Sequence, residues 1–421
     1  MDVRFMQRVD YWVGVPLTAV VSVFDRLVRW LRPSPRSTPR RVLLIELSEM
    51  GSAMLAYSSI VNLQSRLSPE SVYFLIFRSN RESVSLLNVI PDEQILTLDD
   101  RSFLRLVVST LRFLVLSRKL KLDTAIDLEL FSRFTALLSY LCGARTRVGF
   151  SNFTDEGLYR GSLLTHRVMY NGSQHMSLNF LSLTMSVFQS PVGAEDEPLL
   201  KEDVRPYVRN LPRRTSTESE RAFAQQTLAP IFTVQPGARI VFFNPDPGQL
   251  ALRGWPVEEY TELASLLCLR FPDVVVATVG LAASGTFAER IGATLDPQRY
   301  FDLTGSTSNI AELLSLFEQG SALVTSDSGP PHLAALVGIP TFVLFGPETP
   351  LRYAPLGDHV RVFYASLACS PCYSAANHRH SPCSNNRCMK VIPALSVFES
   401  LERLLAGESA GEVHSEIAPH G

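Results

Sequence analysis

Short apolar runs alternate with helical patterns along most of the chain, and this alternation predicts an α/β protein. Each run is bounded by turn residues and precedes a segment whose apolar positions repeat at helical spacing. Strands that alternate with helices in this way predict parallel sheets joined by right-handed crossovers. The runs that we expect to be strands are residues 42–47, 72–77, 95–99, 124–130, 148–150, 240–244, 274–280, 341–345 and the run that ends at Val324.

The pattern also predicts two domains. The chain has 421 residues, enough for two separate cores, and residues 191–220 are rich in proline and charge, as expected of a linker. We expect the following divisions: an N-terminal helix and linker over 1–40, a first domain over 41–215, a second domain over 216–390, a last helix within 391–406 and a disordered tail over 407–421.

A separate amphipathic helix is predicted from Pro16 to Leu31. Its apolar residues form one stripe, and polar and basic residues occupy the other faces. A basic amphipathic helix with tryptophans near both ends is typical of a membrane interface. The alternative is a helix packed on the protein itself or across a dimer. The stripe consists of Leu17, Val20, Val21, Phe24, Leu27, Val28 and Leu31.

A second helical segment carries a cationic stripe. Four basic residues fall on one face of a helix whose other positions are mostly apolar. They could contact anionic lipid or a phosphorylated glycolipid that serves as an acceptor. They could equally form the solvated side of a helix that covers a sheet. The four residues are Arg101, Arg105, Arg112 and Lys119.

Composition and charge narrow the possible functions. A hydrophobic content of 46% and a charged content of 19% describe a globular protein, and a net charge of −2 argues against a nucleic-acid partner. Residues 1–41 nevertheless carry eight basic and three acidic residues, which makes a local basic patch. Six cysteines do not suggest a disulfide-stapled secreted domain. Because neither a signal-peptide pattern nor a membrane-spanning apolar run is present, we expect a cytoplasmic protein.

Residues 323–357 contain the most informative motif. A buried run ends at Val324, a small polar turn follows over residues 325–329, and a helix begins at Pro330, where proline suits the first helical turn. Free backbone N–H groups and the helix dipole make such a turn an anion site. It lies beyond the carboxyl end of a strand, where α/β sheets bind ligands. We therefore expect a ligand that carries phosphate.

This segment resembles the signature of glycosyltransferase family 9, which includes the lipopolysaccharide heptosyltransferases. The resemblance implies a GT-B architecture, in which two Rossmann-like domains face each other across a cleft. It also implies an NDP-sugar held mainly by the C-terminal domain, inversion at the anomeric carbon, and a last helix that returns to the first domain. The matching residues are Asp327, Ser328, Gly329, Pro330, His332, Gly338, Pro340, Gly346, Pro347, Pro350, Pro355 and Gly357.

A second donor-binding segment follows the first strand of the second domain. Asn244 and Gly248 lie in the turn N-P-D-P-G, and Arg253 occupies the place of the family's diphosphate-binding lysine. Because no suitable Asp-x-Asp motif is present, we expect no metal cofactor; the helix N-terminus over 328–332 and Arg253 would stabilise the leaving group. A ribose-binding carboxylate is expected after 274–280, where the chain offers only Glu289.

The first-domain turn departs from the family pattern. The family usually has Gly-Asp there, and its Asp is the proposed base, whereas this chain has Gly51-Ser52. Glu49 lies three residues earlier and could serve as the base instead. Alternatively the base is lost, and the protein is a poor transferase or a binding scaffold.

A cysteine-rich segment follows the donor motif. Its C-x₂-C start resembles a zinc site, but its second half is C-x₄-C and the intervening loop is short. A structural metal and reduced or redox-labile cysteines both remain possible interpretations. The cysteines are Cys369, Cys372, Cys383 and Cys388, with His378 and His380 between them.

The residues and the resemblance together predict an inverting glycosyltransferase at the cytoplasmic side of the inner membrane of a bacterium. It would move a sugar from an NDP-sugar, with ADP-heptose as one possibility, to lipopolysaccharide or another lipid-linked glycan. The alternatives are an NDP-sugar epimerase of the same architecture and a degenerate family member that binds a glycolipid. We expect no nucleic-acid partner.

Overall fold

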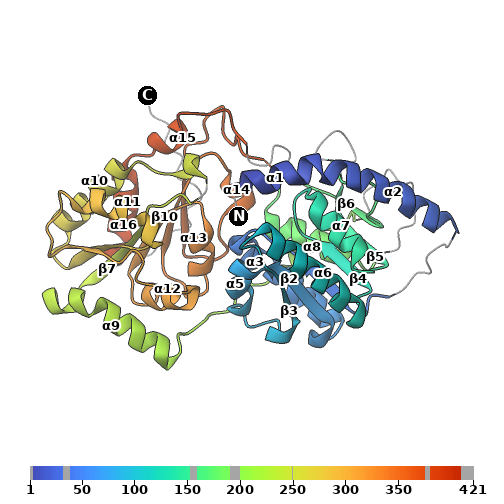
Figure 1. Ribbon diagram of the computed structural model, residues 1–421. Helices are drawn as coiled ribbons and strands as arrows, with labels where there is room; N and C mark the ends of the chain where they lie inside the picture. The colour runs from blue at the N-terminus through green and yellow to red at the C-terminus, as the bar shows by residue number, and fades with distance from the viewer. Residues whose placement is uncertain are drawn as a thin grey trace. The chain divides into compact units, whose positions relative to one another are not determined.

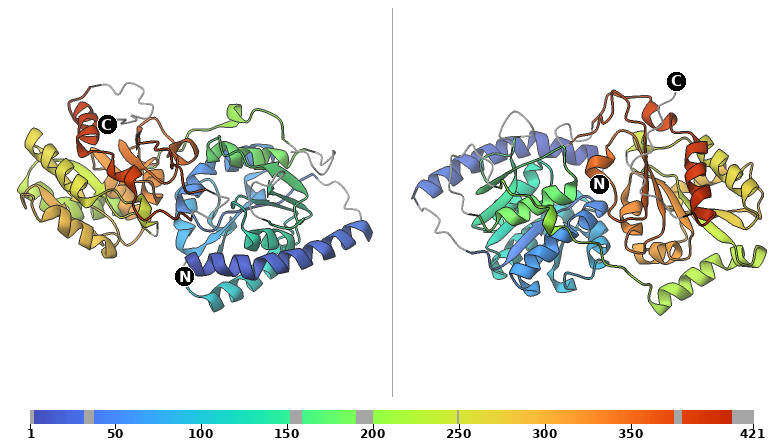
Figure 2. Two further views of the ribbon diagram at one scale, coloured as in Figure 1. Left: turned by 90° about the horizontal axis from the view of Figure 1, so that it is seen from above. Right: turned by 180° about the vertical axis from the view of Figure 1, so that it is seen from behind.

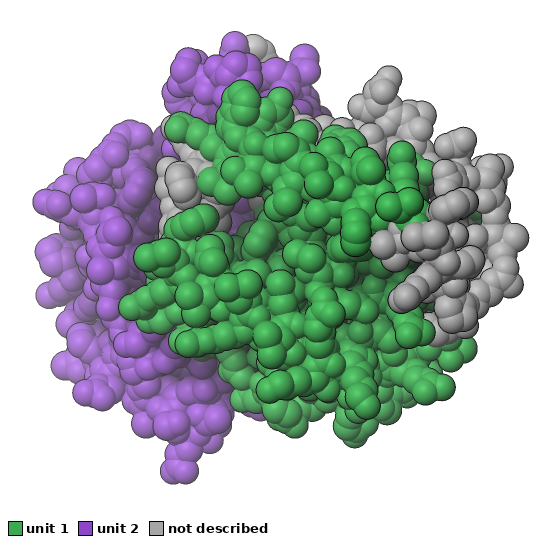
Figure 3. Space-filling view, turned by 45° about the vertical axis from the view of Figure 1, so that its right-hand side comes forward, with its two compact units in different colours: residues 1–210, 375–379 green, residues 211–374, 380–421 purple. Residues whose placement is uncertain are grey.

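A computed structural model describes residues 3–31, 38–151, 159–189, 200–248, 250–374 and 380–408 of the chain. The contacts divide it into two compact units, unit 1 within residues 1–210 and unit 2 within residues 211–374 and 380–421, which Figure 3 colours separately. The division falls inside the segment 191–220. Most of the expected disordered tail and His378 lie outside the described residues.

Unit 1 contains one six-stranded parallel sheet in the order β3-β2-β1-β4-β5-β6. Its strands are β1 (Val42–Ile45), β2 (Val72–Phe77), β3 (Ile95–Leu98), β4 (Thr124–Asp127), β5 (Thr146–Ser151) and β6 (His166–Met169). Its helices are α1 (Val3–Trp12), α2 (Gly14–Leu31), α3 (Met50–Leu55), α4 (Tyr57–Arg66), α5 (Arg81–Ser85), α6 (Phe103–Lys119), α7 (Arg133–Leu141) and α8 (Met176–Ser186) (Figure 1).

Unit 2 contains a second six-stranded parallel sheet, in the order β12-β11-β10-β7-β8-β9. Its strands are β7 (Arg239–Asn244), β8 (Val274–Thr278), β9 (Tyr300–Asp302), β10 (Ala322–Ser326), β11 (Thr341–Phe345) and β12 (Val360–Tyr364). Its helices are α9 (Glu218–Val234), α10 (Val257–Arg270), α11 (Gly285–Gly292), α12 (Ile310–Phe317), α13 (Gly329–Ala334), α14 (Pro350–Tyr353), α15 (Arg387–Lys390) and α16 (Ala394–Leu405).

The two sheets have the same topology. In each, the chain adds three strands towards one edge, crosses back over the sheet, and adds three more towards the other edge. The point where the direction reverses lies between β1 and β4 in unit 1 and between β7 and β10 in unit 2. All residues of β1 and β10 are buried, as expected for parallel strands covered on both faces. The predicted α/β fold is therefore confirmed, and loops at the two reversal points are in the position where α/β folds bind ligands.

The last helix differs from expectation. The family resemblance implied that it returns to the first domain, but α16 packs against α10 of unit 2. Its side chains Val397 and Leu401 are fully buried in the core of unit 2. The Glu259 carboxylate accepts a hydrogen bond from the Ala394 backbone N–H at 2.7 Å and fixes the start of this helix. The apolar face of α16 thus completes the second core.

The N-terminal helices pack on unit 1 as an additional layer. Contacts join both α1 and α2 to α7, which in turn covers β4 and β5. Helix α7 is therefore enclosed between the sheet and the N-terminal pair, as Figures 1 and 2 show. The structure thus bears out the alternative of a helix packed on its own protein, although the face that makes the contact is the polar one.

Candidate donor-binding site

The loop after β10 forms the centre of the candidate site in unit 2. Strand β10 ends at Ser326, and the backbone N–H of Asp327 donates to the Leu344 carbonyl of β11 at 3.0 Å, which fixes the turn to the sheet. Ser328 is extended and precedes α13. Because Pro330 and Pro331 carry no N–H, the backbone donors that this turn can offer an anion at its start are those of Ser328 and Gly329. The turn thus offers an anion fewer backbone donors than a helix start without prolines would offer.

Arg253 and Asp327 meet beside this loop. Arg253 Nε lies 3.3 Å from Asp327 Oδ2, and the two side chains are 13% and 6% exposed. Among the described residues, neither of these two atoms has a hydrogen bond of good geometry. Burial raises the pKa of the Asp327 carboxyl, and the Arg253 guanidinium opposes that rise. The two charged groups are therefore close but not hydrogen-bonded through these atoms. The Arg253 guanidinium could reorient to contact a ligand and lose no such hydrogen bond to Asp327.

A second buried pair lies on the neighbouring loop. Glu348 Oε1 is 3.0 Å from Arg352 Nη2 and accepts a hydrogen bond from the Thr349 backbone N–H at 3.0 Å. Burial raises the pKa of Glu348 to about 7; Arg352 opposes this rise, and the charge of Asp327 adds to it. Sequence reasoning missed Glu348, because only the fold brings the loops after β10 and β11 together.

The loop after β7 holds the remaining donor candidates in place. The Asn244 side-chain amide donates to the Val279 carbonyl at 3.1 Å, and its oxygen accepts from the Thr325 hydroxyl at 3.3 Å. Asn244 therefore links β10 and the end of β8 to its own strand, β7. Gly248 has a φ of +64° and donates its N–H to Asp246 Oδ1 at 2.8 Å, which makes a tight turn.

A carboxylate does reach the loop where a ribose-binding group is expected. Glu289 is exposed on α11, but Asp246 Oδ2 accepts a hydrogen bond from the Ser284 hydroxyl at 2.6 Å. Asp246 thus comes from the loop after β7 rather than from the segment that follows β8. The sequence contained this aspartate in the turn N-P-D-P-G, but it did not show that its side chain reaches the loop after β8.

The first-domain turn in unit 1 places Glu49 beside Ser52. The Ser52 hydroxyl donates to Glu49 Oε2 at 3.1 Å, and Ser52 is 6% exposed whereas Glu49 is half-buried. Glu49 precedes α3 in an extended conformation. The structure therefore places the Glu49 carboxylate next to the Ser52 hydroxyl at the start of α3.

Another carboxylate, which sequence reasoning missed, shapes this turn. Glu129 Oε1 accepts hydrogen bonds from the backbone N–H groups of Leu47 and Ser48, at 3.0 and 3.1 Å. Glu129 follows β4, so the reversal point of the unit 1 sheet carries both Glu49 and Glu129. Nearby, buried Asp127 pairs with Arg160, and burial raises the pKa of Asp127 to about 6.

The cationic stripe of α6 is three residues rather than four. Arg101 precedes the helix and forms an ion pair with Asp99, with Nη2 and Oδ2 at 2.6 Å. Arg105, Arg112 and Lys119 are exposed on the helix and have no ion-pair partner among the described residues.

The cysteine segment shows no metal centre in the part of the chain that the structure describes. No group of three His, Cys, Asp or Glu side chains there has a geometry that could hold a metal ion. Cys388 is buried and Cys372 is half-buried, whereas Cys369 and Cys383 are exposed. The segment is attached to the loop after β11, because the backbone N–H of Cys372 donates to the Pro347 carbonyl at 2.9 Å.

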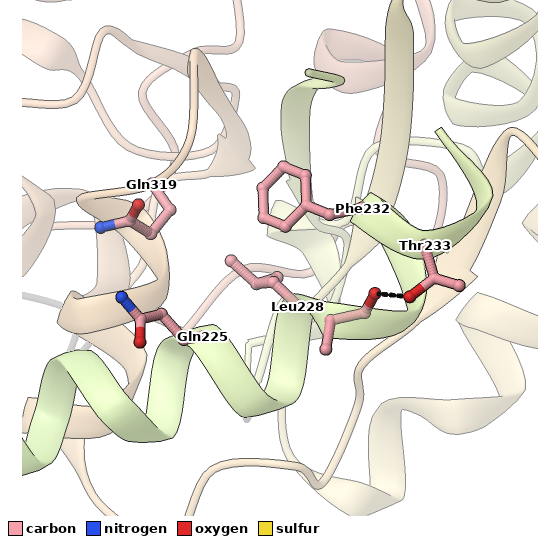
Figure 4. Close-up of a pocket in the computed structure, with 6 residues that line it drawn as sticks. Gln225, Leu228, Phe232, Thr233 and Gln319 are labelled. Carbon is pink, nitrogen blue, oxygen red and sulfur yellow. Dashed lines mark hydrogen bonds between the residues drawn. The ribbon is translucent and has the colours of Figure 1, made fainter. Parts of the chain in front are cut away.

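One depression in unit 2 lies apart from these loops. Figure 4 shows its lining, which comes mainly from α9 and includes no charged group: Gln225, Leu228, Ala229, Phe232, Thr233 and Gln319. The Thr233 hydroxyl donates a hydrogen bond to the Ala229 carbonyl at 2.8 Å. This surface offers no cation for a phosphate.

Two Rossmann-like units with an anion-type turn at the reversal point of the second sheet define the chain as a protein of the GT-B fold. Comparison with known proteins then gives the family. Residues 118–381 match the model of glycosyltransferase family 9 (heptosyltransferase), and the chain belongs to this family.

Individual relatives agree with this assignment. The chain is 33% identical over 176 residues to lipooligosaccharide heptosyltransferase 2 of Haemophilus influenzae, covering 40% of this chain and 46% of that one. It is 26% identical over 172 residues to lipopolysaccharide heptosyltransferase 3 of Escherichia coli K12, covering 41% and 45%. The chain thus spans slightly less than half the length of these two relatives.

Solved structures show the same fold. An Escherichia coli ADP-heptose lipopolysaccharide heptosyltransferase II superposes with a TM-score of 0.65 and 21% identity, covering 88% of this chain and all of that one. A family 9 glycosyltransferase from Veillonella parvula gives 0.68 and 16%, covering 89% and 99%.

Proposed function

We propose that this protein is an inverting glycosyltransferase that moves a sugar from an NDP-sugar to a lipid-linked glycan of the cell envelope. The observation that carries the proposal is the Arg253–Asp327 pair beside the turn after β10, in a member of glycosyltransferase family 9. The names of the relatives favour a heptose as the sugar, ADP-heptose as the donor and lipopolysaccharide as the acceptor.

Unit 2 would hold the donor. The diphosphate would accept hydrogen bonds from the backbone at Ser328 and Gly329, and Arg253 would turn from Asp327 to grip its oxygens. Both groups would stabilise the charge that develops on the leaving diphosphate. His332 belongs to the same turn and is buried behind it. A cation-bearing loop of this kind supports a reaction without a metal.

Unit 1 would supply the base. In the proposed step, Glu49 takes the proton of an acceptor hydroxyl while that oxygen attacks the anomeric carbon. The bond from the anomeric carbon to the diphosphate oxygen breaks, and the nucleoside diphosphate leaves with both electrons of that bond. A direct displacement inverts the anomeric carbon. Support comes from the Ser52 hydroxyl, which donates a hydrogen bond to the Glu49 carboxylate and orients it.

A glycolipid-binding protein without transferase activity is the second candidate. The observation in its favour is Ser52, which stands where the family has Asp. The two candidates differ in one measurable respect, because only a transferase releases nucleoside diphosphate.

The proposal places the protein in the cytoplasm at the inner membrane, where a lipid-linked acceptor would be accessible. Within the described residues, no helix is both long enough and apolar enough to cross a bilayer. The exposed apolar residues of α2 support attachment to the membrane surface.

The test is to incubate the purified protein with a panel of NDP-sugars, with and without total membrane glycolipid. We expect release of nucleoside diphosphate that depends on both one donor and the glycolipid. Epimerised donor without release would indicate an epimerase. Glycolipid binding with neither product would indicate the binding protein.

A further inference from the structure

Helix α2 is attached to unit 1 by its polar face. Its buried side chains are Thr18, Ser22 and Asp25, which follow Gly14 at helical spacing. The described part of the predicted apolar stripe mostly points away from the unit: Leu17, Val20, Phe24 and Leu27 are between 46% and 68% exposed, and Val21 is half-buried. Val23, beside the stripe, is 68% exposed, and the side chains of Val28 and Leu31 lie outside the described residues. An ordinary surface helix buries its apolar stripe, so this arrangement is the reverse of the usual one.

The buried seam beneath α2 is specific. The Ser22 hydroxyl accepts a hydrogen bond from the Ser162 backbone N–H at 2.9 Å. A side chain at Gly161 would lie 2.2 Å from the Ser22 hydroxyl oxygen, so the close approach requires glycine. Asp25 and Arg147 form a buried ion pair at 3.4 Å. These contacts fix the outward orientation of the stripe.

Helix α1 is held in the same way. Asp10 accepts hydrogen bonds from the backbone N–H groups of Arg133 and Phe134 at 3.0 and 2.9 Å, at the start of α7. Its other oxygen pairs with Arg133 Nη1 at 3.1 Å, and Arg133 is only 2% exposed. The two N-terminal helices are therefore a fixed part of unit 1 and not a flexible tether.

Helix α6 carries a second outward apolar stripe. It buries Leu106, Phe113 and Ser117 against the unit, while seven apolar side chains are exposed. The cations Arg105, Arg112 and Lys119 run along one edge of this stripe. The exposed apolar residues are Phe103, Leu104, Val107, Val108, Leu111, Val115 and Leu116, with Leu104 exposed by 75%.

The two stripes belong to the same side of the sheet of unit 1. The crossover after β3 places α6 on the side that also carries α7, and α2 packs over α7 (Figures 1 and 2). More than half of the exposed large apolar side chains among the described residues lie on α6 or on the segment from Tyr11 to Leu27. So large a concentration marks an interaction surface.

The charges on this surface have one sign. Helix α6 contains no acidic residue, and the two carboxylates of the N-terminal helices, Asp10 and Asp25, are used in the buried contacts. Arg26 is exposed beside the α2 stripe and, within the described residues, has no ion-pair partner. Two exposed apolar stripes that are flanked by cations and not by carboxylates complement an anionic lipid surface.

We propose that α2 and α6 together form a rigid docking surface by which unit 1 binds an anionic bilayer. The exposed apolar side chains enter the boundary between headgroups and acyl chains, and Arg26, Arg105, Arg112 and Lys119 contact the headgroup phosphates. This deepens the proposed function, since it names the partner surface that a lipid-linked acceptor would require. It does not depend on the donor, the base or any sugar transfer.

The test is flotation of the full-length protein with vesicles of phosphatidylcholine alone or of phosphatidylcholine with phosphatidylglycerol, in the absence of any sugar. We expect binding only to the anionic vesicles, decreasing with salt. The double variant Val20→Glu/Phe24→Glu and the double variant Leu104→Glu/Leu111→Glu should each weaken binding more than tenfold. Arg105→Gln/Arg112→Gln should weaken it by about tenfold or more.

Matched controls lie in unit 2. Leu269→Glu replaces an apolar side chain that is 85% exposed, and Arg387→Gln removes an exposed cation; neither should change binding. Unchanged thermal unfolding of the variants shows that they fold, and the two stripes provide independent tests.

Three results would overturn the inference. One is a wild-type protein that ignores anionic vesicles, and another is glutamate variants that still bind them. The third is a soluble dimer that the stripe variants dissociate while vesicles are not bound, because a second copy would then cover the surface. Vesicle binding without nucleotide release in the transfer assay would leave this inference intact and contradict the proposed transferase activity alone.

Discussion

Helices α6 and α12 occupy the same place in two sheets of the same topology, yet their outer faces differ. Each is the crossover that carries the chain back over its sheet, from β3 to β4 and from β9 to β10. Helix α9 packs on α12, and no residue of α12 is among the exposed large apolar side chains. Helix α6 exposes seven such side chains. Since the fold itself does not require an uncovered apolar helix, the difference indicates a partner for unit 1.

The reversal points of the two sheets differ in chemistry as well. In unit 1 the loops carry Glu49 and Glu129, two carboxylates. In unit 2 the loop after β7 carries Arg253, which pairs with buried Asp327 of the loop after β10, and Arg352 on α14, after β11, pairs with buried Glu348. A carboxylate suits proton removal from an acceptor, and guanidinium groups suit a diphosphate. The same topology therefore presents carboxylates at the reversal point of unit 1 and a guanidinium–carboxylate pair at that of unit 2.

The base assignment in unit 1 should show the largest effect. We expect Glu49→Gln to lower the rate of glycolipid-dependent diphosphate release about 100- to 10,000-fold, because the acceptor hydroxyl would keep its proton. The measurement is steady-state release with saturating donor.

Controls sharpen this prediction. Glu70→Gln changes an exposed glutamate of the same unit and should leave the rate unchanged. The double variant Glu49→Gln/Ser52→Asp moves the carboxylate to the neighbouring side chain and should recover most of the activity. A Glu49→Gln variant with normal turnover would disprove the displaced base.

The cation of unit 2 should show the next largest effect. We expect Arg253→Met to lower the same rate about 100- to 1,000-fold, since the leaving diphosphate would lose a charged donor. Arg253→Met also leaves Asp327 buried without its partner. The double variant Arg253→Met/Asp327→Asn removes that charge and should recover stability but not activity. Recovery of activity in the double variant would contradict a role for Arg253 at the diphosphate.

The seam under α2 should have a moderate effect on stability. Gly161 has a φ of +70°, and an added Cβ would lie 2.6 Å from Thr18 Cγ2. We expect Gly161→Ala to reduce the free energy of unfolding by about 2–4 kcal/mol and to speed hydrogen exchange in α2. Gly237→Ala is the matched control, because its φ is +76° and nothing lies within 4 Å of the added atom. Equal losses in the two variants would show that only backbone strain matters.

Glu348 should produce the smallest effect, a dependence of stability on pH. Its pKa is raised from 4.5 to about 7 in the folded protein, so the folded state holds the proton more tightly than the unfolded chain. The stabilisation is therefore complete below about pH 4.5 and is lost as the pH rises through about 7. The free energy of unfolding of the wild type should fall between about pH 4.5 and 7. We expect Glu348→Gln to reduce this fall by about 1–3 kcal/mol, measured by denaturant titration at several pH values. An unchanged pH profile would show that Glu348 is ionised throughout.

The central strands could be predicted from sequence, and several edge elements could not. Strands such as β1 and β10 are continuous apolar runs, because both faces of a parallel sheet are covered. The edge strands β9 and β12 are only partly buried, and their sequences YFD and VRVFY carry no such run. Helix α8 was missed as well; it is buried on most sides, so its apolar and polar positions show little helical contrast.

The site was predicted where a motif is local and missed where the fold makes the contact. Residues 325–332 form one turn in sequence and in space, so the donor loop could be recognised directly. The contact of Glu129 with Leu47 spans 82 residues, and that of Asp25 with Arg147 spans 122. Periodicity likewise identifies the apolar stripe of α2 but does not show which face packs inward. That choice depends on Arg147 and Ser162, which are distant in sequence.

The most direct test of the proposed transfer is to follow a labelled sugar from ADP-heptose into the lipid fraction of total membrane glycolipid, with the purified protein as the only catalyst. We expect the label to enter the lipid fraction in a one-to-one ratio with released ADP, and entry to stop with Arg253→Met. Label that stays in the aqueous fraction with every NDP-sugar tested, although the protein binds the donor, would contradict a transferase.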